Sequence, residues 1–112
     1  MLYTKNSQTQ NFAVVDAGMN ALVRPALYGA YHRIENISKK EHFMEQTYDV
    51  VGPICETTDR FGEQVSLPVT ERGDLLVIQS CGAYAESMAS DYNLRERPQS
   101  VFINNYCEVY SK

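Results

Sequence analysis

A glycine and a proline directly after a strand-like segment set the strongest limit on the fold of this chain. Thr47 to Val51 contains β-favouring Thr, Tyr and Val, and Gly52-Pro53 follows it at once. Proline has no N–H to donate to a strand ladder, so the regular strand must end there. The sequence therefore predicts that a rigid strand presents the turn Cys55-Glu56-Thr57-Thr58-Asp59, which carries one thiol and two carboxylates.

Two further segments in the first third of the chain predict strands. Phe12 to Asp16 is a short apolar run, and the turn-forming Gly and Asn of Ala17-Gly18-Met19-Asn20 follow it, so we expect a buried strand that delivers a loop. Tyr31 to Ile37 can form another strand. Met1 to Gln10 is polar, gives no start signal for any element, and resembles a domain border.

The second half of the chain predicts a turn, a strand and a hairpin. Glu71-Arg72-Gly73-Asp74 has turn composition, and the apolar run Leu75 to Ile78 after it predicts a central strand covered on both faces. Ser100 to Ile103 and Tyr106 to Tyr110 flank Asn104-Asn105, and Asn tolerates the positive φ of a tight turn. We therefore expect a terminal hairpin.

Composition favours one mainly β domain. The chain has 112 residues, of which 44% are hydrophobic, with eight Tyr, four Phe and no Trp. A domain of this size buries roughly two-thirds of the surface that its unfolded chain exposes, so a hydrophobic core can form. The net charge of -4 and a pI near 5.1 argue against binding to nucleic acid or an anionic membrane through overall charge.

The cysteines indicate neither a metal site nor a disulfide framework. They lie at positions 55, 81 and 107, which is too far apart for a CxxC zinc motif, and three cysteines are too few for a fold held together by several disulfides. Reduced thiols in a cytoplasmic protein are the simplest interpretation. No apolar run approaches the ~18 residues of a membrane span or has the form of a signal peptide.

Arg24, Tyr28 and Tyr31 are candidates for binding, although each also has a structural interpretation. Pro25 disfavours helix at the residue before it, which predicts an extended Arg24 whose guanidinium can grip a carboxylate with two parallel hydrogen bonds. A surface arginine is the alternative. Tyr28 and Tyr31 can direct hydroxyls into a site or pack in the core.

The turn after the proline carries three further candidates. Cys55 is either a small buried apolar residue or a proton donor, because the neighbouring carboxylates would raise its pKa and disfavour a standing thiolate. Glu56 can accept hydrogen bonds from a substrate ammonium or lie exposed in solvent. Asp59 has the same two possibilities, with capping of the turn as its structural role.

Tyr84 is a further candidate for binding, whereas the two histidines are not. Tyr84 closes Gly82-Ala83-Tyr84, where backbone N–H groups and a phenol could meet a phosphate. His32 and His42 do not stand at metal-ligand spacing with an acid or thiol, so both are interpreted as structural or surface residues.

Six sequence blocks, in order, resemble the successive signatures of the diaminopimelate decarboxylases, a family of fold-type III pyridoxal-phosphate enzymes. The match spans nearly the whole chain. In the Cys-Glu turn the family's usual Ser-Gly pair is replaced by Thr57-Thr58. The blocks are Val14-Val15-Asp16-Ala17-Gly18-Met19-Asn20, Arg24-Pro25-Ala26-Leu27-Tyr28, Val51-Gly52-Pro53-Ile54-Cys55-Glu56, Gly73-Asp74-Leu75-Leu76, Gly82-Ala83-Tyr84, and Ser87-Met88-Ala89-Ser90-Asp91-Tyr92-Asn93 with Arg97-Pro98.

The resemblance implies that residues 1–112 form the single C-terminal β domain of such an enzyme. The expected fold is mainly β, a barrel or sandwich-like domain of the alanine racemase/decarboxylase type with short helical turns. The family's N-terminal (β/α)8 barrel carries the lysine that binds pyridoxal 5'-phosphate, and such a barrel needs about 200 residues or more, so it is absent here. None of the four lysines matches the family's lysine motif, and the isolated chain is expected to be inactive.

The resemblance also implies roles for five residues in converting meso-2,6-diaminopimelate to L-lysine and CO2. Arg24 and Tyr28 would bind the distal carboxylate, and Glu56 the distal ammonium. Tyr84 would contact the substrate and the cofactor phosphate. Cys55 would reach across a homodimer interface and protonate the carbanion left by loss of CO2.

Two alternatives stay open. An ornithine- or arginine-type decarboxylase shares the fold but usually has Cys-Asp at the turn and lacks the Arg-Pro-Ala-Leu-Tyr block. A stand-alone binding or dimerisation module would keep the β fold without catalysis.

Overall fold

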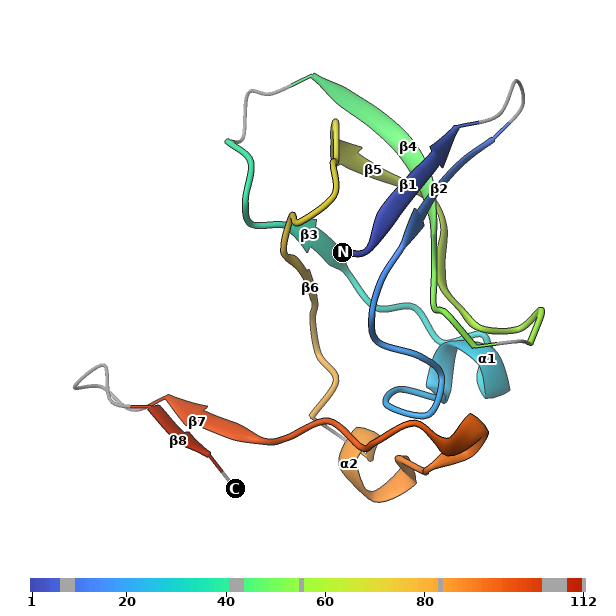
Figure 1. Ribbon diagram of the computed structural model, residues 1–112, viewed down its shortest axis with the longest axis vertical. Helices are drawn as coiled ribbons and strands as arrows, with labels where there is room; N and C mark the ends of the chain where they lie inside the picture. The colour runs from blue at the N-terminus through green and yellow to red at the C-terminus, as the bar shows by residue number, and fades with distance from the viewer. Residues whose placement is uncertain (7–9, 41–43, 55, 83, 104–108, 112) are drawn as a thin grey trace.

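The computed structural model describes residues 1–6, 10–40, 44–54, 56–82, 84–103 and 109–111, and the fold is mainly β (Figure 1). Two short helices and one 3-10 turn interrupt the strands. The elements are β1 Tyr3–Asn6, β2 Asn11–Val14, α1 Arg24–Tyr28, β3 Ile34–Asn36, β4 Glu45–Val51, β5 Arg60–Pro68, β6 Leu76–Ile78, α2 Ala85–Met88, the 3-10 turn Tyr92–Leu94, β7 Val101–Ile103 and β8 Val109–Ser111.

The largest sheet has four strands in the order β1-β2-β4-β5. β2 and β4 run parallel, while β1 and β5 pair antiparallel at the two edges. The predicted strands in 12–16 and 47–51 are thus confirmed. Tyr48, Val50 and Leu67, the largest fully buried side chains, come from β4 and β5 and anchor the core.

Two strands of this sheet were not predicted. β1 lies in the polar N-terminal stretch and pairs with β2 through its backbone, with Tyr3 opposite Val14. Such an edge strand is mostly exposed and needs no apolar alternation. β5 contains an irregularity in its pairing with β4, where Gln64 adopts φ 48° and donates its N–H to the buried carboxylate of Asp49 at 2.9 Å. A β-bulge of this kind breaks the alternating pattern by which a strand is recognised.

The prediction of a central strand at 75–78 is wrong. Among the described residues β6 pairs only with β3, in a two-stranded sheet, and Leu75 and Val77 are 61% and 37% exposed. An apolar run can belong to an edge strand when the chain leaves one of its faces uncovered. In the described residues the sheets also do not close into a barrel, so the mainly β prediction is confirmed while barrel closure is not seen.

The terminal hairpin is confirmed as a pairing of two strands. β7 and β8 are antiparallel, with Ile103 opposite Val109. Figure 1 shows this hairpin set apart from the four-stranded sheet. The predicted turn at Asn104-Asn105 lies outside the described residues.

Arg24 is helical, so the prediction that it is extended is wrong. It is the first residue of α1, with Pro25 in the first turn, where a missing N–H has no cost because no helical partner exists for it. Gly29 ends the helix with φ 65° and donates its N–H to the Pro25 carbonyl at 3.0 Å, while the Ala30 N–H donates to the Arg24 carbonyl at 3.4 Å. A left-handed residue at this position favours glycine.

A buried polar cluster fixes the predicted turn at 71–74, which is confirmed. Oδ2 of Asp74 accepts hydrogen bonds from Asn36 Nδ2 and the Glu71 N–H, both at 3.0 Å, and Lys39 Nζ lies 3.6 Å from Oδ1. Burial pushes the pKa of Asp74 upward, but the Asn36 and Glu71 donors and the Lys39 charge outweigh it and lower that pKa below 3.8. The ionised carboxylate therefore stabilises the fold.

Asp74→Asn is expected to remove part of the chain's sensitivity to acid. Because the pKa of folded Asp74 is lowered, its stabilisation is complete above the unfolded value and is lost as pH falls through the folded pKa. Asparagine keeps an oxygen for Asn36 and Glu71 but carries no charge. Urea unfolding between about pH 7 and about pH 3 should show a wild-type advantage near neutrality that shrinks in acid. An advantage that grows in acid would contradict this account.

Candidate functional site

The turn between β4 and β5 is held by its own backbone. The Gly52 N–H donates to the Asp59 carbonyl at 2.9 Å, the Glu56 N–H to Ile54 at 2.8 Å, and the Asp59 N–H to Glu56 at 3.0 Å. Neither Thr57 nor Thr58 has a positive φ, so the turn forms without the glycine usual in the family. The Glu56 side chain is exposed, and its Oε1 accepts a hydrogen bond from Thr57 Oγ1 at 3.4 Å. Cys55 lies outside the described residues.

The buried side chain of Asp59 caps this turn by accepting hydrogen bonds from backbone N–H groups. Its side chain is buried, with 3% of the residue exposed, and its two oxygens accept from the Ile54 N–H at 2.7 Å and the Met19 N–H at 2.8 Å. A Cβ on Gly52 would lie 2.4 Å from the same carboxylate, so glycine is required for this close approach. The structure therefore gives Asp59 the turn-capping role.

The carboxyl of Asp59 has a perturbed pKa. Burial raises the pKa of Asp59 above 3.8, and the Ile54 and Met19 donors and the charge of Arg95 offset only part of this rise. The sign is opposite to that of Asp74: protonation of Asp59 becomes easier in the fold, so its ionised form lowers stability as pH rises through its folded pKa.

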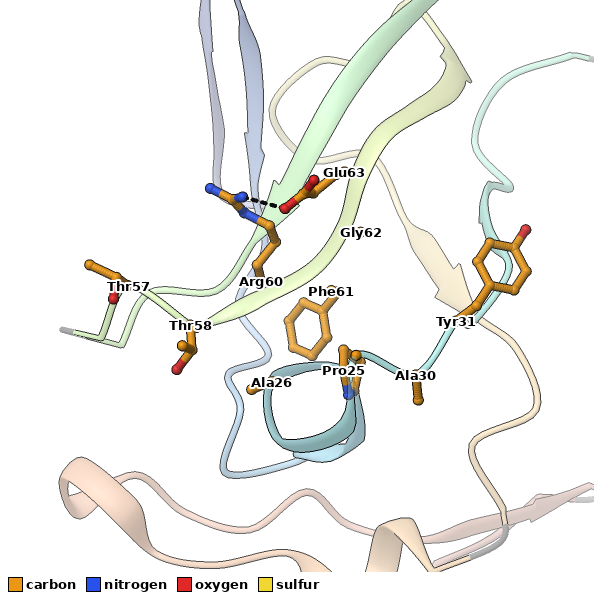
Figure 2. Close-up of a pocket in the computed structure, with 11 residues that line it drawn as sticks. Pro25, Ala26, Ala30, Tyr31, Thr57, Thr58, Arg60, Phe61, Gly62 and Glu63 are labelled. Carbon is orange, nitrogen blue, oxygen red and sulfur yellow. Dashed lines mark hydrogen bonds and ion pairs between the residues drawn. The ribbon is translucent and has the colours of Figure 1, made fainter.

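The helix that carries Arg24 and Tyr28 lies beside this turn. Arg24 is half-buried, whereas Tyr28 is 65% exposed. A shallow hollow of about 390 Å³ separates α1 from the turn and the start of β5 (Figure 2). Its walls include Pro25 and Ala26 from the helix and Thr57 and Thr58 from the turn. Arg24, Tyr28 and Glu56 do not line the hollow, but the segments that carry them form two of its sides.

Tyr84 stands before α2 in a strained conformation. It has φ 67°, which is rare for a bulky side chain, and it is 67% exposed. Backbone strain of this kind costs on the order of 1–3 kcal/mol and is concentrated at functional sites. A second hollow, of about 460 Å³, lies next to it between Leu22, Gly82, Ala85 and Arg97.

The structure brings some of the predicted site residues together and leaves others apart. The α1 helix and the Glu56 turn share a hollow, and residues before α1 share another with the residues around Tyr84. Among the described residues, Arg24, Tyr28, Glu56 and Tyr84 make no ion pair or hydrogen bond with one another. These residues lie on loops and short helices at the surface.

The described histidine is structural. His32 is buried, and its Nδ1–H donates to the Gln79 carbonyl at 3.0 Å, while the free thiol of Cys81 lies 3.8 Å from the same nitrogen. His42 lies outside the described residues. In the described ranges no group of His, Cys, Asp and Glu could hold a metal ion, and no helix is long and apolar enough to cross a membrane.

The described residues thus form a sheet domain that offers charged and phenolic side chains at its surface, beside two open hollows. Residues 1–82 match the model of the family described as "Pyridoxal-dependent decarboxylase, C-terminal sheet domain". The chain belongs to this family.

Relatives of this chain include diaminopimelate decarboxylases of bacteria and of a plant. The enzyme of Bacteroides thetaiotaomicron is 52% identical over 99 residues, which are 88% of this chain and 25% of that protein. A probable chloroplastic enzyme of Oryza sativa is 45% identical over 101 residues, 90% of this chain and 21% of that protein. The chain thus spans about a quarter of the length of the curated relatives it matches.

Solved structures agree with the sequence relatives. Diaminopimelate decarboxylase of M. jannaschii has a TM-score of 0.91 and 37% identity over 98% of this chain and 25% of that one. The Helicobacter pylori enzyme, complexed with L-lysine, has a TM-score of 0.88 and 40% identity over 98% of this chain and 26% of that one. A lysine/ornithine decarboxylase of Vibrio vulnificus shares the fold, with a TM-score of 0.73 at 24% identity over 84% of this chain and 26% of that one.

Proposed function

We propose that residues 1–112 form the C-terminal domain of a pyridoxal-phosphate-dependent diaminopimelate decarboxylase, which converts meso-2,6-diaminopimelate to L-lysine and CO2. The observation that carries this proposal is the 52% identity to the Bacteroides thetaiotaomicron diaminopimelate decarboxylase over most of the chain. The chain contributes substrate-binding and proton-donating residues, and is inactive without a barrel domain.

The chain's own residues recognise the end of the substrate that does not react. The Arg24 guanidinium and the Tyr28 hydroxyl bind the distal carboxylate, because a planar fork and a phenol both donate to carboxylate oxygens. Glu56 accepts hydrogen bonds from the distal ammonium. The half-buried Arg24 and the exposed Tyr28 and Glu56 support this division, since each presents a polar group at the surface.

Cys55 supplies the proton that replaces the lost carboxylate. In this proposal the thiol donates from Sγ to the α-carbon after CO2 has left, and it does so in the partner's site of a homodimer. A thiol that carries its proton suits this role, because it can act as a general acid.

Among the described residues, few are suited to hold the cofactor. The strained and exposed Tyr84 offers a hydroxyl to the phosphate and the substrate, whereas Lys39 is engaged by Glu71 and Asp74 and could not serve as a cofactor lysine without losing both. When bound, pyridoxal phosphate supplies an electron sink for loss of CO2. The barrel domain would provide most of its contacts.

The proposed partners follow from this division of the site. They are an N-terminal barrel domain of the same enzyme and a second copy of the polypeptide, with a cytoplasmic location in which the Cys81 thiol stays reduced. An ornithine- or arginine-type decarboxylase is disfavoured, because the turn carries Glu56 and the block Arg24-Pro25-Ala26-Leu27-Tyr28 is present. A stand-alone module is disfavoured because 88% of this chain is 52% identical to one part of a much longer diaminopimelate decarboxylase.

Release of CO2 from meso-diaminopimelate tests the proposal. The polypeptide that carries this domain together with a barrel domain and pyridoxal phosphate should decarboxylate this diacid and leave ornithine and arginine almost untouched. Cleavage of ornithine or arginine in preference would support the alternative decarboxylase, and no reaction with any of the three would overturn the proposed activity. The 112-residue chain without a barrel serves as the inactive control.

A further inference from the structure

The loop 16–20 leads into the helix that carries Arg24 and contacts the turn that carries Glu56 and the segment that follows Tyr84. It follows β2 and leads through a turn, in which the Ala21 N–H donates to the Gly18 carbonyl at 2.9 Å, into the helix with Arg24. Figure 1 shows the chain passing from β2 through this loop to α1. Further contacts connect the loop to the Glu56 turn and to the segment after Tyr84.

Asp59 makes the connection to the Glu56 turn. One of its oxygens accepts from the Met19 N–H in the loop and the other from the Ile54 N–H in the turn. Both oxygens of one buried carboxylate therefore hold the turn to a loop residue, Met19, that lies 40 positions from Asp59 in sequence. Each N–H in this pair would be left without its acceptor if the carboxylate were lost, which is costly in a buried site.

Glycine permits the two segments to approach closely. A Cβ on Gly18 would lie 2.6 Å from Ile54 Cδ1, a distance that real side chains do not adopt. Ile54 is buried against this glycine and immediately precedes the Cys-Glu pair. The backbone of the loop at Gly18 therefore packs directly against the Ile54 side chain of the turn.

Asn20 makes the connection to the segment after Tyr84. Its Nδ2 donates to the carbonyls of Ser90 and Glu96, both at 3.2 Å, and its own carbonyl accepts from the Ser90 N–H at 2.8 Å. Only α2 and one further residue separate Tyr84 from Ser90, and the Met88 N–H donates to the Tyr84 carbonyl at 3.0 Å. Asn20 itself is buried, with 3% of the residue exposed.

We propose that Asp59 and Asn20 are positioning residues. Asp59 fixes the turn that carries Glu56 to the loop 16–20, and Asn20 fixes the segment that follows Tyr84 to the same loop, so that the two segments keep a constant distance from each other. The inference rests on the proposed function for the roles of Glu56 and Tyr84. Neither positioning residue touches the substrate: Asp59 acts through the turn, and Asn20 through the segment around α2. A shift of about 1 Å at a binding group can lower the rate by as much as about 100-fold, so such fixation matters.

Asp59→Asn tests the first connection and has a matched control. Asparagine has one carbonyl oxygen, so it can serve either Met19 or Ile54 but not both. In Asp74→Asn the single oxygen can still serve both donors, because Asn36 and Glu71 share Oδ2. Asp59→Asn should raise the KM for meso-diaminopimelate about tenfold or more, per bound cofactor, whereas Asp74→Asn should leave it within about twofold.

Amide hydrogen exchange supplies a readout that does not depend on activity. In the intact polypeptide, peptides covering 16–22 and 52–60 should exchange faster in Asp59→Asn, while peptides of β4 and β5 keep their protection. Asn20→Asp, which removes the donor to two carbonyls, should speed exchange over 84–97 and lower kcat per bound cofactor. Asn11→Asp is its control, because Asn11 donates to a single carbonyl at an exposed site.

Each outcome decides one question. Unchanged KM and unchanged exchange in Asp59→Asn, with wild-type activity intact, would overturn the positioning role. A second result would also overturn the positioning role: less cofactor-loaded enzyme, but a normal KM in the enzyme that does bind cofactor. A residue with a merely structural role changes the amount of folded protein and leaves the KM of the folded part unchanged. If the wild-type polypeptide does not decarboxylate diaminopimelate, the proposed function fails, and the exchange measurements still test whether the loop holds the two segments.

Discussion

Arg24→Ala is expected to raise the KM for meso-diaminopimelate by about 10- to 150-fold in the complete enzyme. Charge-assisted hydrogen bonds contribute roughly 1.5–3 kcal/mol, and each 1.4 kcal/mol corresponds to about a factor of ten. The half-buried position of Arg24 in the first turn of α1 limits access of water and supports a value in this range. Steady-state release of CO2 as a function of substrate concentration gives the KM.

Two variants separate the guanidinium from general charge effects. Arg24→Lys keeps the charge but loses the planar fork, so most of the KM increase should remain. Arg33→Ala removes an exposed arginine that pairs with Glu35 at 2.7 Å beside β3, and should change the KM by less than about twofold. An unchanged KM in Arg24→Ala would remove Arg24 from the binding site.

The sequence predicts segments whose structure depends on local chemistry. Gly52-Pro53 ends β4 wherever the strand lies in the sheet, and the buried face of β4 follows from its own Tyr and Val residues. The family resemblance likewise depends only on residues in order. These features needed no knowledge of which distant segments meet.

Features that depend on tertiary contacts were missed or wrongly predicted. The helix at Arg24 forms although Pro25 follows, because only the first turn is involved and Gly29 provides the end signal. The Leu75–Ile78 run gave no sign of which face would stay uncovered.

The two proposed positioning residues also could not be predicted from the sequence. Asp59 and Asn20 carry no local signal beyond turn composition, and their function comes from partners 40 and 70 positions away. A buried carboxylate with two backbone donors cannot be distinguished from an exposed loop residue in a single sequence. The candidate ligand-binding residues were found through motif order, whereas the residues that hold them were found through burial and hydrogen bonds.

Phe61 connects the core to the helix that carries Arg24 and Tyr28. It is buried on β5 and belongs to the main hydrophobic cluster. Figure 2 shows its ring pointing from β5 toward α1, at Pro25 and Ala26. α1 has no buried residue of its own, so this ring is a principal support for the helix among the described residues.

Phe61→Ala is therefore expected to lower the free energy of unfolding by about 3–5 kcal/mol, the usual range for truncation of a buried aromatic ring. Phe61→Leu, which keeps most of the apolar volume, should cost less than about 1.5 kcal/mol. Urea unfolding of the intact polypeptide measures both, and exchange over 24–30 should accelerate even in Phe61→Leu if the ring supports α1. A loss below about 1 kcal/mol in Phe61→Ala would mean that α1 is held by other contacts, and the Arg24 site would then be independent of the β5 core.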